Sequence, residues 1–301
     1  MKMSGDVAIK DGVAAFGKVP DDVVHFLVSA FGDDVGVREC TEGHRVQSGR
    51  QFNGDAGEAD MLYGELLPET VSIVLDRLGC LRDGACGSIL ELGMGTGKVA
   101  FQSFFQCRGC KTVVGVEISA PRFEVAVAAA HRLVREHPGR FVARSASDQE
   151  LSEFLCGDGA VHGTVVEELA GEGRKLWLLE GDLAIVAMPG GPVDVAQGLL
   201  LQLRIPKSAR PRAYEVIQKA PDGCRAFTLE NLSWEWILDE PGVMHSMREG
   251  VELGDTDLYA TSWCPAGYPF YLWQVDRTKK CTIDFDTAYR NVEDLYAQAF
   301  F

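Results

Sequence analysis

The chain has 301 residues, of which 46% are hydrophobic and 24% charged, a balance that is ordinary for a globular protein. Its formal net charge of −15 argues against a protein held to nucleic acid by its overall electrostatic field. No apolar stretch reaches the roughly 18 residues that a membrane-spanning helix needs, so we expect no membrane association. The nine cysteines, an odd number with no export signal ahead of them, indicate reduced thiols in an intracellular protein.

The first 60 residues are expected to form a small helical attachment ahead of a larger domain at 61–301. In "DDVVHFLVSAF", residues 21–31, apolar side chains recur at helical spacing. The stretch at 48–60 is rich in glycine and polar residues, which is typical of a loop. A proline in the first turn and apolar periodicity then predict a helix over "PETVSIVLDRLGCL", residues 68–81.

From residue 87 the pattern alternates between short apolar runs and amphipathic helices. "GSILELG" at 87–93 and "TVVGVE" at 112–117 are predicted to be buried strands. Each is followed by a predicted helix, at 98–106 and at 121–137. This succession is the beginning of a doubly wound parallel sheet, so the predicted fold class is α/β.

The rest of the chain is predicted to complete this sheet. An insertion, partly helical and of uncertain order, is expected at about 141–175. Beyond it we expect the strand "KLWLLEGDL" (175–183), the strand "GLLLQLRI" (198–205), the helix "AYEVIQKAPDG" (213–223) and the strand "CRAFTLENL" (224–232). The aromatic run at 258–278 favours a closing antiparallel pair of strands.

The run "LELGMGTGKVAF", residues 90–101, raises the question of which ligand approaches its three glycines. A Walker phosphate loop needs a serine or threonine after the lysine, where Val99 stands, and a dinucleotide loop needs glycine or alanine at Lys98. The pattern that fits is an acid at Glu91 followed by glycines at alternate positions, which is the turn of S-adenosylmethionine methyltransferases. That cofactor has no phosphate, and glycines let its adenosine and methionine parts lie against bare backbone.

A second acid supports the same interpretation. Glu117 ends the next predicted strand, twenty residues after Gly97, where a carboxylate can accept hydrogen bonds from both ribose hydroxyls. Glu91 can hold the ammonium end of the cofactor, directly or through water. The alternative is a chance glycine turn with a surface acid, which the strand–turn–helix–strand context disfavours.

Two further stretches resemble one methyltransferase family. "LYGELLPETV" at 62–71 and "SWCPAGYPFYLWQVDRT" at 262–278 are similar to the non-SET histone lysine methyltransferases named for disruption of telomeric silencing. The similarity runs from about Tyr63 to Thr278, broken by the insertion at about 141–175. It implies a Rossmann-like class I methyltransferase fold, in a short form without the long basic tail of some members.

The resemblance also implies an S-adenosylmethionine site. A loop made of Tyr63, Gly64, Glu65 and Leu66 would fold over the methionine end of the cofactor. Glu117 would be the ribose acid, Asp182 would bond the adenine amino group, and Leu183 would pack against the adenine. The main cofactor turn would consist of Glu91, Leu92, Gly93, Met94, Gly95, Thr96, Gly97 and Lys98.

An aromatic channel for the substrate lysine is implied as well. Tyr63, Trp263, Phe270 and Tyr271 would line it, and Gln202 would stand where the family carries an active-site asparagine. Such a channel aligns nitrogen, methyl and sulfur, and it disfavours the charged ammonium by desolvation, so we name no general base. Core packing is the alternative for the aromatic residues, and a satisfied polar residue at a strand end is the alternative for Gln202.

This chain departs from the family pattern at four positions. Leu66 stands where threonine is usual and Phe270 where tyrosine is usual, so two hydroxyls are lost. Leu183 replaces a usual phenylalanine and Gln202 a usual asparagine. The acidic stretch at 230–242 also lies where family members can present basic residues to the nucleosome.

The resulting prediction is a nuclear, S-adenosylmethionine-dependent protein-lysine N-methyltransferase that acts on a core lysine of nucleosomal histone H3. The basic loop at 204–212 would contact DNA phosphate or an acidic histone surface, with a solvated loop as the alternative. No metal is expected, because "CRGC" at 107–110 lacks a clean second cysteine pair. Two rival hypotheses are a methyltransferase of the same fold with another protein or a small molecule as substrate, and a cofactor-binding protein without turnover.

Overall fold

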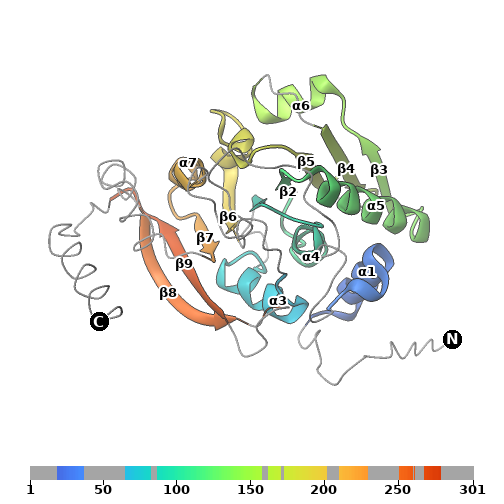
Figure 1. The fold of residues 1–301 in the computed structure, drawn as a ribbon, viewed down its shortest axis with the longest axis horizontal. Helices are drawn as coiled ribbons and strands as arrows, with labels where there is room; N and C mark the ends of the chain where they lie inside the picture. Colours follow the sequence, from blue (N-terminus) through green and yellow to red (C-terminus); the bar gives the residue numbers. More distant parts are fainter. Residues whose placement is uncertain are drawn as a thin grey trace, which may run out of the picture.

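A computed structural model describes the chain at residues 19–36, 65–82, 87–157, 162–170, 173–201, 210–229, 251–259, 261 and 268–278. In this part of the chain, nine strands form one sheet with helices packed on both of its faces (Figure 1). None of the helices in these ranges combines the length and the apolar character that crossing a membrane requires.

The middle of the sheet is parallel. Its strands lie in the order β5, β2, β1, β6 and β7, so the chain winds outward from β1 on both sides. Their bounds are β1 (Ser88–Leu92), β2 (Thr112–Glu117), β5 (Lys175–Glu180), β6 (Ala196–Leu201) and β7 (Arg225–Thr228). All five residues of β1 are buried, as expected for a strand covered on both faces.

Two layers of helices cover this sheet. On one face lie α3 (Pro68–Arg77), α4 (Lys98–Gln106) and α5 (Ala120–Glu136), with a core rich in phenylalanine. On the other lie α7 (Arg210–Lys219) and the short 3-10 helices η3 (Leu183–Ala187) and η4 (Pro192–Val195). The predicted helix at 98–106 and strand at 112–117 are confirmed with the same bounds.

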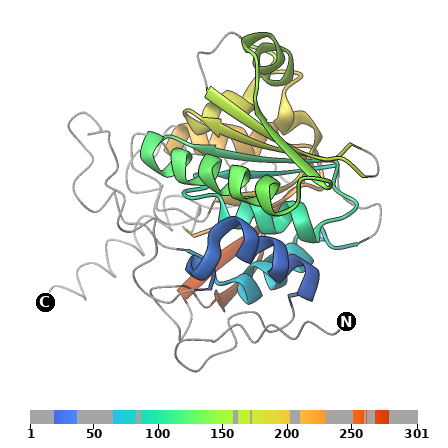
Figure 2. The same ribbon diagram turned by 90° about the vertical axis from the view of Figure 1, so that its right-hand side faces the viewer.

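The N-terminal attachment is described at 19–36 only, and the predicted helix there is confirmed as α1 (Asp21–Phe31). The 3-10 helix η1 (Gly32–Asp34) follows it directly. Phe26 and Phe31 of α1 are buried, and their rings contact those of Phe105 and Phe101 in α4. α1 as a whole packs on α4 and α5 (Figure 2). This segment therefore shares the hydrophobic core of the larger domain.

The C-terminal strands close the sheet as an antiparallel pair, as predicted, but the first of them lies almost entirely ahead of the predicted run at 258–278. β8 (Val251–Tyr259) and β9 (Tyr268–Val275) form an antiparallel pair, and β9 also pairs antiparallel with β7. The sheet therefore ends in the order β7, β9, β8, with β9 running against its neighbours.

The insertion at 141–175 extends the other edge of the sheet. The expected helix is α6 (Asp148–Leu155), and its capping box of Ser147 and Glu150 explains why it begins there. Two strands that the sequence did not predict flank it: β3 (Phe141–Ser145) pairs antiparallel with β4 (His162–Glu168), which pairs antiparallel with β5. β3 is mostly half-buried and carries polar and charged residues, so it gives no clear apolar run.

A buried arginine joins this extension to the central sheet. Arg174, which precedes β5, forms an ion pair with Glu168 of β4 at 2.9 Å. Its guanidinium also donates to the carbonyl oxygens of Phe104, Cys107 and Cys110, around the C-terminal end of α4. The bond to Phe104 satisfies a carbonyl that the last turn of α4 leaves without an intrahelical partner, and the other two fix the loop that follows the helix.

Candidate functional site

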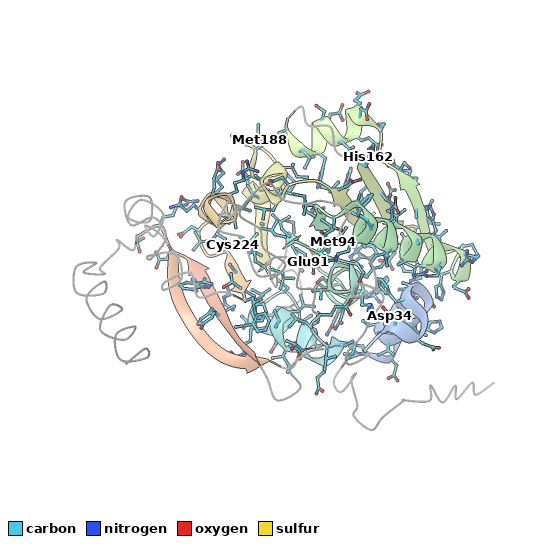
Figure 3. The ribbon with its side chains drawn as sticks, in the orientation of Figure 1. Asp34, Glu91, Met94, His162, Met188 and Cys224 are labelled. Carbon is cyan, nitrogen blue, oxygen red and sulfur yellow. The ribbon has the colours of Figure 1, made fainter. Side chains whose placement is uncertain are left out.

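The predicted site residues follow the carboxyl ends of the parallel strands. Glu91 lies in β1, Glu117 ends β2, and Asp182 follows β5. Parallel strands end at the same edge of a sheet, and in doubly wound sheets the ligand crevice lies where the winding reverses, here between β1 and β6. Glu91 and Met94 lie near the middle of the molecule, and Asp34 lies beside α1 (Figure 3).

The turn between β1 and α4 requires its glycines. Gly93, Gly95 and Gly97 have φ angles of 81°, 58° and 86°, in the left-handed region that side chains other than glycine rarely adopt. A Cβ atom added at Gly97 would also lie 3.1 Å from the Cβ of Ala126 in α5. The glycine spacing read from the sequence therefore corresponds to backbone geometry at each position.

The apolar side chains of this turn face the core. Leu92 is fully buried, and Met94 is 4% exposed. A Cβ atom at Gly115 would lie 2.4 Å from the sulfur of Met94, so the methionine side chain occupies the space above that glycine. The backbone of Met94 is engaged as well, because its N–H donates to Val116 and its carbonyl accepts from Gly97.

Glu117 braces the glycine turn. Its carboxylate accepts the backbone N–H of Gly95 at 2.7 Å and that of Ser119 at 2.8 Å. Burial raises the pKa of Glu117 above its ordinary value, although the two backbone hydrogen bonds and the nearby charge of Arg122 act in the opposite direction. Each carboxylate oxygen has a second acceptor position, so bracing the turn leaves capacity for ribose hydroxyls.

Asp182 lies next to Glu117 in space. The Cα atoms of Glu117 and Glu180 are partners across β2 and β5, and the backbone N–H of Gly181 donates to the carbonyl of Glu117 at 2.9 Å. Asp182 caps η3 by accepting the N–H of Ala184 at 2.9 Å, and it forms an ion pair with Arg212 of α7. Leu183 packs against the core on the α7 face.

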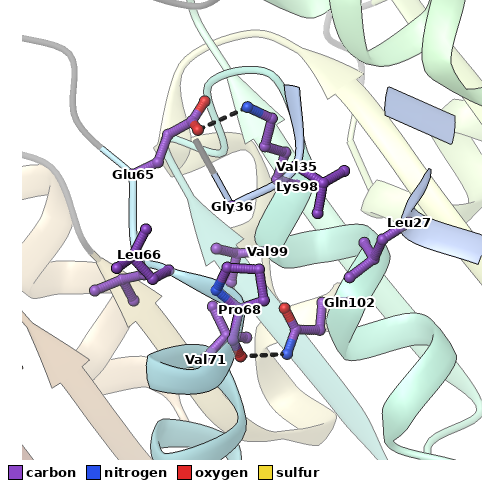
Figure 4. A pocket seen from close by; sticks show the side chains of 11 residues that line it. Leu27, Val35, Gly36, Glu65, Leu66, Pro68, Val71, Lys98, Val99 and Gln102 are labelled. Carbon is purple, nitrogen blue, oxygen red and sulfur yellow. Dashed lines mark hydrogen bonds and ion pairs between the residues drawn. The ribbon is translucent and has the colours of Figure 1, made fainter. Parts of the chain in front are cut away.

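Glu65 and Lys98, which the resemblance assigns to the cofactor site, are in direct contact. Their carboxylate and ammonium form an ion pair at 2.7 Å (Figure 4). The hydroxyl of Thr96 donates to the same carboxylate at 3.2 Å. Lys98 forms a second ion pair at 2.7 Å with Asp34 of η1. The sequence did not single out Asp34, because nothing local relates it to a lysine 64 residues later.

A cavity lies below this ion-pair cluster (Figure 4). Its walls come from α1, the residues after η1, the segment ahead of α3, and the first turns of α3 and α4. The lining residues are Leu27, Val35, Gly36, Glu65, Leu66, Leu67, Pro68, Val71, Lys98, Val99 and Gln102. Most of them are apolar, so the cavity separates the polar cluster from the core beneath it.

An isolated backbone bridge links the first family-like stretch to the residue just ahead of the second. Leu66 pairs antiparallel with Thr261, and both residues are buried. The segment before α3 therefore lies beside the residue that precedes the predicted channel motif at 262–278. Tyr63, Gly64, Gln202 and Trp263 lie outside the described residues, as does most of the basic loop at 204–212.

The side chains of Phe270 and Tyr271 lie on opposite faces of the sheet. Successive side chains of a strand point to opposite faces of the sheet. Phe270 is fully buried on the α4 face, where it stacks on Phe227 with ring centroids 4.8 Å apart. Tyr271 is partly buried on the α7 face, near Trp273. Phe270 therefore packs in the core, which is the alternative to a position in the channel that the sequence left open.

In the described ranges, no three His, Cys, Asp or Glu side chains form a group that could hold a metal ion. Cys107 and Cys110, the pair with zinc-like spacing, are buried and form no disulfide.

Taken together, the parallel strands wound on both sides of β1, the reversed strand β9 and the glycine turn between two acids define the fold. It is the Rossmann-like fold of class I S-adenosylmethionine-dependent methyltransferases. The reversed β9 distinguishes this sheet from an entirely parallel doubly wound sheet.

No protein-family model matches the chain, and no curated protein is significantly similar to it in sequence. Among solved structures, Trm1 from Pyrococcus horikoshii in complex with S-adenosylmethionine is similar at 11% identity with a TM-score of 0.42; the match covers 70% of this chain and 55% of Trm1. A putative O-methyltransferase from Klebsiella pneumoniae is similar at 12% identity with a TM-score of 0.43, covering 86% of this chain and 93% of that one. The chain therefore spans about half the length of Trm1, and at these values the likenesses carry no argument about chemistry.

Proposed function

We propose that this protein binds S-adenosylmethionine at the glycine turn and transfers its methyl group. The observation that carries this proposal is the set of three glycines with positive φ between an acid in β1 and an acid at the end of β2. Between residues 91 and 98 the one cation is Lys98, and it is already paired with two acids. This arrangement suits a phosphate-free ligand with a positive charge better than a dinucleotide.

The described residues fit the parts of that cofactor. Glu117 has acceptor capacity for the ribose hydroxyls, and Asp182, beside it, would receive the adenine amino group. The bare backbone of the turn would accommodate adenosine and methionine, while Glu91 and Glu65 would lie at the ammonium end. When bound, the cofactor supplies a methyl group on a positively charged sulfur.

For the finer function, we infer a protein-lysine N-methyltransferase that acts on nucleosomal histone H3 in the nucleus. The resemblance of 62–71 and 262–278 to the telomeric-silencing family supports this, as does the bridge between Leu66 and Thr261, because it joins the cofactor segment to the residue that precedes the channel motif.

In this mechanism the chain must deliver a neutral amine in line with the methyl group. Aromatic walls would remove water from the lysine and lower the pKa of its ammonium, so that it loses its proton to solvent before attack. The cofactor would supply the methyl group to the nitrogen lone pair, and the electron pair of the carbon–sulfur bond would remain on sulfur. The contribution of the chain would be to hold the amine at attack distance, and this mechanism requires no dedicated general base.

Labelled cofactor with three substrates tests this function. Wild-type protein is expected to label nucleosomes, and to label free histone H3 and H3 peptide poorly, while Gly95→Arg labels none of them. Mass spectrometry of the labelled histone then identifies the lysine and the number of methyl groups. Labelling of small molecules or of other proteins, with none on nucleosomes, would overturn the histone assignment. Cofactor binding without transfer to any substrate would indicate a protein without turnover.

A further inference from the structure

The ion-pair cluster of Asp34, Lys98 and Glu65 joins three distant parts of the chain. Asp34 ends η1, Glu65 precedes α3, and Lys98 is the first residue of α4. Both nitrogen–oxygen distances are 2.7 Å, and the side chains are only 10% to 15% exposed. Ion pairs this well shielded from water are screened less than surface pairs, so their geometry constrains the segments that carry them.

The position of Lys98 makes the two acids necessary. A cation at the first position of a helix is disfavoured by the partial positive charge of the helix N-terminus. α4 has no acidic residue in its own first turn to offset this. The offset comes from Asp34 and Glu65, which lie in other segments. If either acid is lost, the mostly buried ammonium of Lys98 keeps only one of the two carboxylates that offset its charge at the helix N-terminus.

Glu65 transmits this arrangement to the glycine turn. One of its oxygens accepts from Lys98, and the other accepts from the hydroxyl of Thr96, which lies between Gly95 and Gly97. The neighbouring residue Leu66 forms the bridge to Thr261. The segment ahead of α3 therefore has two attachments. The carboxylate of Glu65 bonds to the glycine turn, and the backbone of Leu66 pairs with Thr261.

We propose that Asp34 is a positioning residue for the cofactor site. Through Lys98, it holds Glu65 and the glycine turn in the conformation that binds cofactor, so that docking of the α1–η1 segment sets cofactor affinity. This inference rests on the proposed function. Its physical basis is preorganisation, because a segment already held in place loses less conformational freedom on binding.

Calorimetric titration of the full chain with S-adenosylmethionine tests this role. Asp34→Asn should raise the dissociation constant about tenfold. The adjacent Asp33→Asn removes the same charge from an exposed position and should bind like wild type. Asp34→Glu keeps the carboxylate and should bind within about threefold of wild type, equivalent to ~0.6 kcal/mol. Thermal unfolding of each variant, measured in parallel, reports any loss of folding.

A double-mutant cycle separates action through Lys98 from general destabilisation. If Asp34 acts through the ammonium, Asp34→Asn should have no further effect on affinity in a Lys98→Gln background. Wild-type affinity in Asp34→Asn, or the same tenfold loss with and without Lys98, would overturn this inference while leaving the proposed function intact. Wild-type protein that binds no cofactor would overturn both.

Discussion

The carboxylate of Glu117 accepts the backbone N–H of Gly95 at 2.7 Å, and this bond joins the end of β2 to the middle of the glycine turn. The two residues are 22 positions apart in sequence and belong to the two halves of the predicted cofactor signal. They therefore form one structural unit, in which the ribose acid also shapes the turn.

Glu117→Gln should weaken cofactor binding at least tenfold. Gly95 and Ser119 donate to different oxygens of the carboxylate, and the substitution replaces one of these oxygens by an NH2 group, which cannot accept a hydrogen bond. Hydrogen bonds to charged acceptors contribute about 1.5–3 kcal/mol each, which is enough for such a loss. Calorimetric titration measures it, and Glu124→Gln, a substitution on the polar side of α5, provides the control. Unchanged affinity in Glu117→Gln would mean that the carboxylate does not serve the cofactor.

Cofactor affinity should depend on pH through the same carboxyl group. Burial raises the pKa of Glu117 above its ordinary value of 4.5, so protonation sets in at a higher pH than for an exposed glutamate. Because ribose hydroxyls need the ionised acceptor, affinity should fall as the pH drops through this raised pKa.

The stability of the fold depends on the pH in the opposite direction to the affinity. The buried carboxyl favours its protonated form, so its contribution is most favourable below 4.5 and is lost as the pH rises through the raised pKa. Calorimetric titrations with cofactor at pH values across this range should show an affinity that falls at low pH in wild type and does not fall in Glu117→Gln. The same fall in both proteins would assign the pH dependence to another group.

Gly97→Ala should destabilise the protein more than Gly223→Ala does. Both glycines have positive φ, 86° and 83°, so both substitutions carry a backbone cost of roughly 1–2 kcal/mol. Only at Gly97 does the new Cβ also meet a neighbour, the Cβ of Ala126 at 3.1 Å, whereas nothing lies within 4 Å at Gly223. Urea unfolding of the two variants isolates the crowding. Equal losses would show that α5 gives way at no cost.

Arg174→Met should lower the free energy of unfolding by roughly 1–3 kcal/mol, the cost of leaving a buried polar group without its partner. The substitution removes a donor from three carbonyls near the end of α4 and takes away the nearest cation of Glu168, which keeps Arg140 at 3.1 Å and Arg108 at 3.5 Å. Arg144→Met, which breaks a surface ion pair with Glu150, should change stability far less. Similar losses in the two variants would contradict a central role for Arg174.

The sequence was informative where local chemistry decides the structure. The helix at 98–106 begins after a left-handed glycine and matches its predicted bounds, because the turn residues punctuate the chain there. Glu117 and the glycine turn were likewise predictable, since their roles depend on strand ends and backbone freedom.

The sequence was less informative where the decisive contacts are distant or lack an apolar pattern. The bond between Asp34 and Lys98 spans 64 residues, and most partners of Arg174 are backbone carbonyls that carry no sequence signal. Strand β3 is an edge strand whose mixed residues resemble a loop. For Phe270 and Tyr271, the resemblance suggested one channel, whereas strand alternation places the two rings on opposite faces.

Calorimetric titration of wild-type protein and Gly95→Arg with S-adenosylmethionine, and with NAD as a dinucleotide comparison, tests cofactor recognition at the turn. The long arginine side chain at a position with φ of 58° would lie in the path of the cofactor. We expect saturable one-site binding of S-adenosylmethionine by wild type, none by Gly95→Arg, and no binding of NAD by either protein. Binding of NAD at the turn, or equal affinity of both proteins for S-adenosylmethionine, would contradict the assignment.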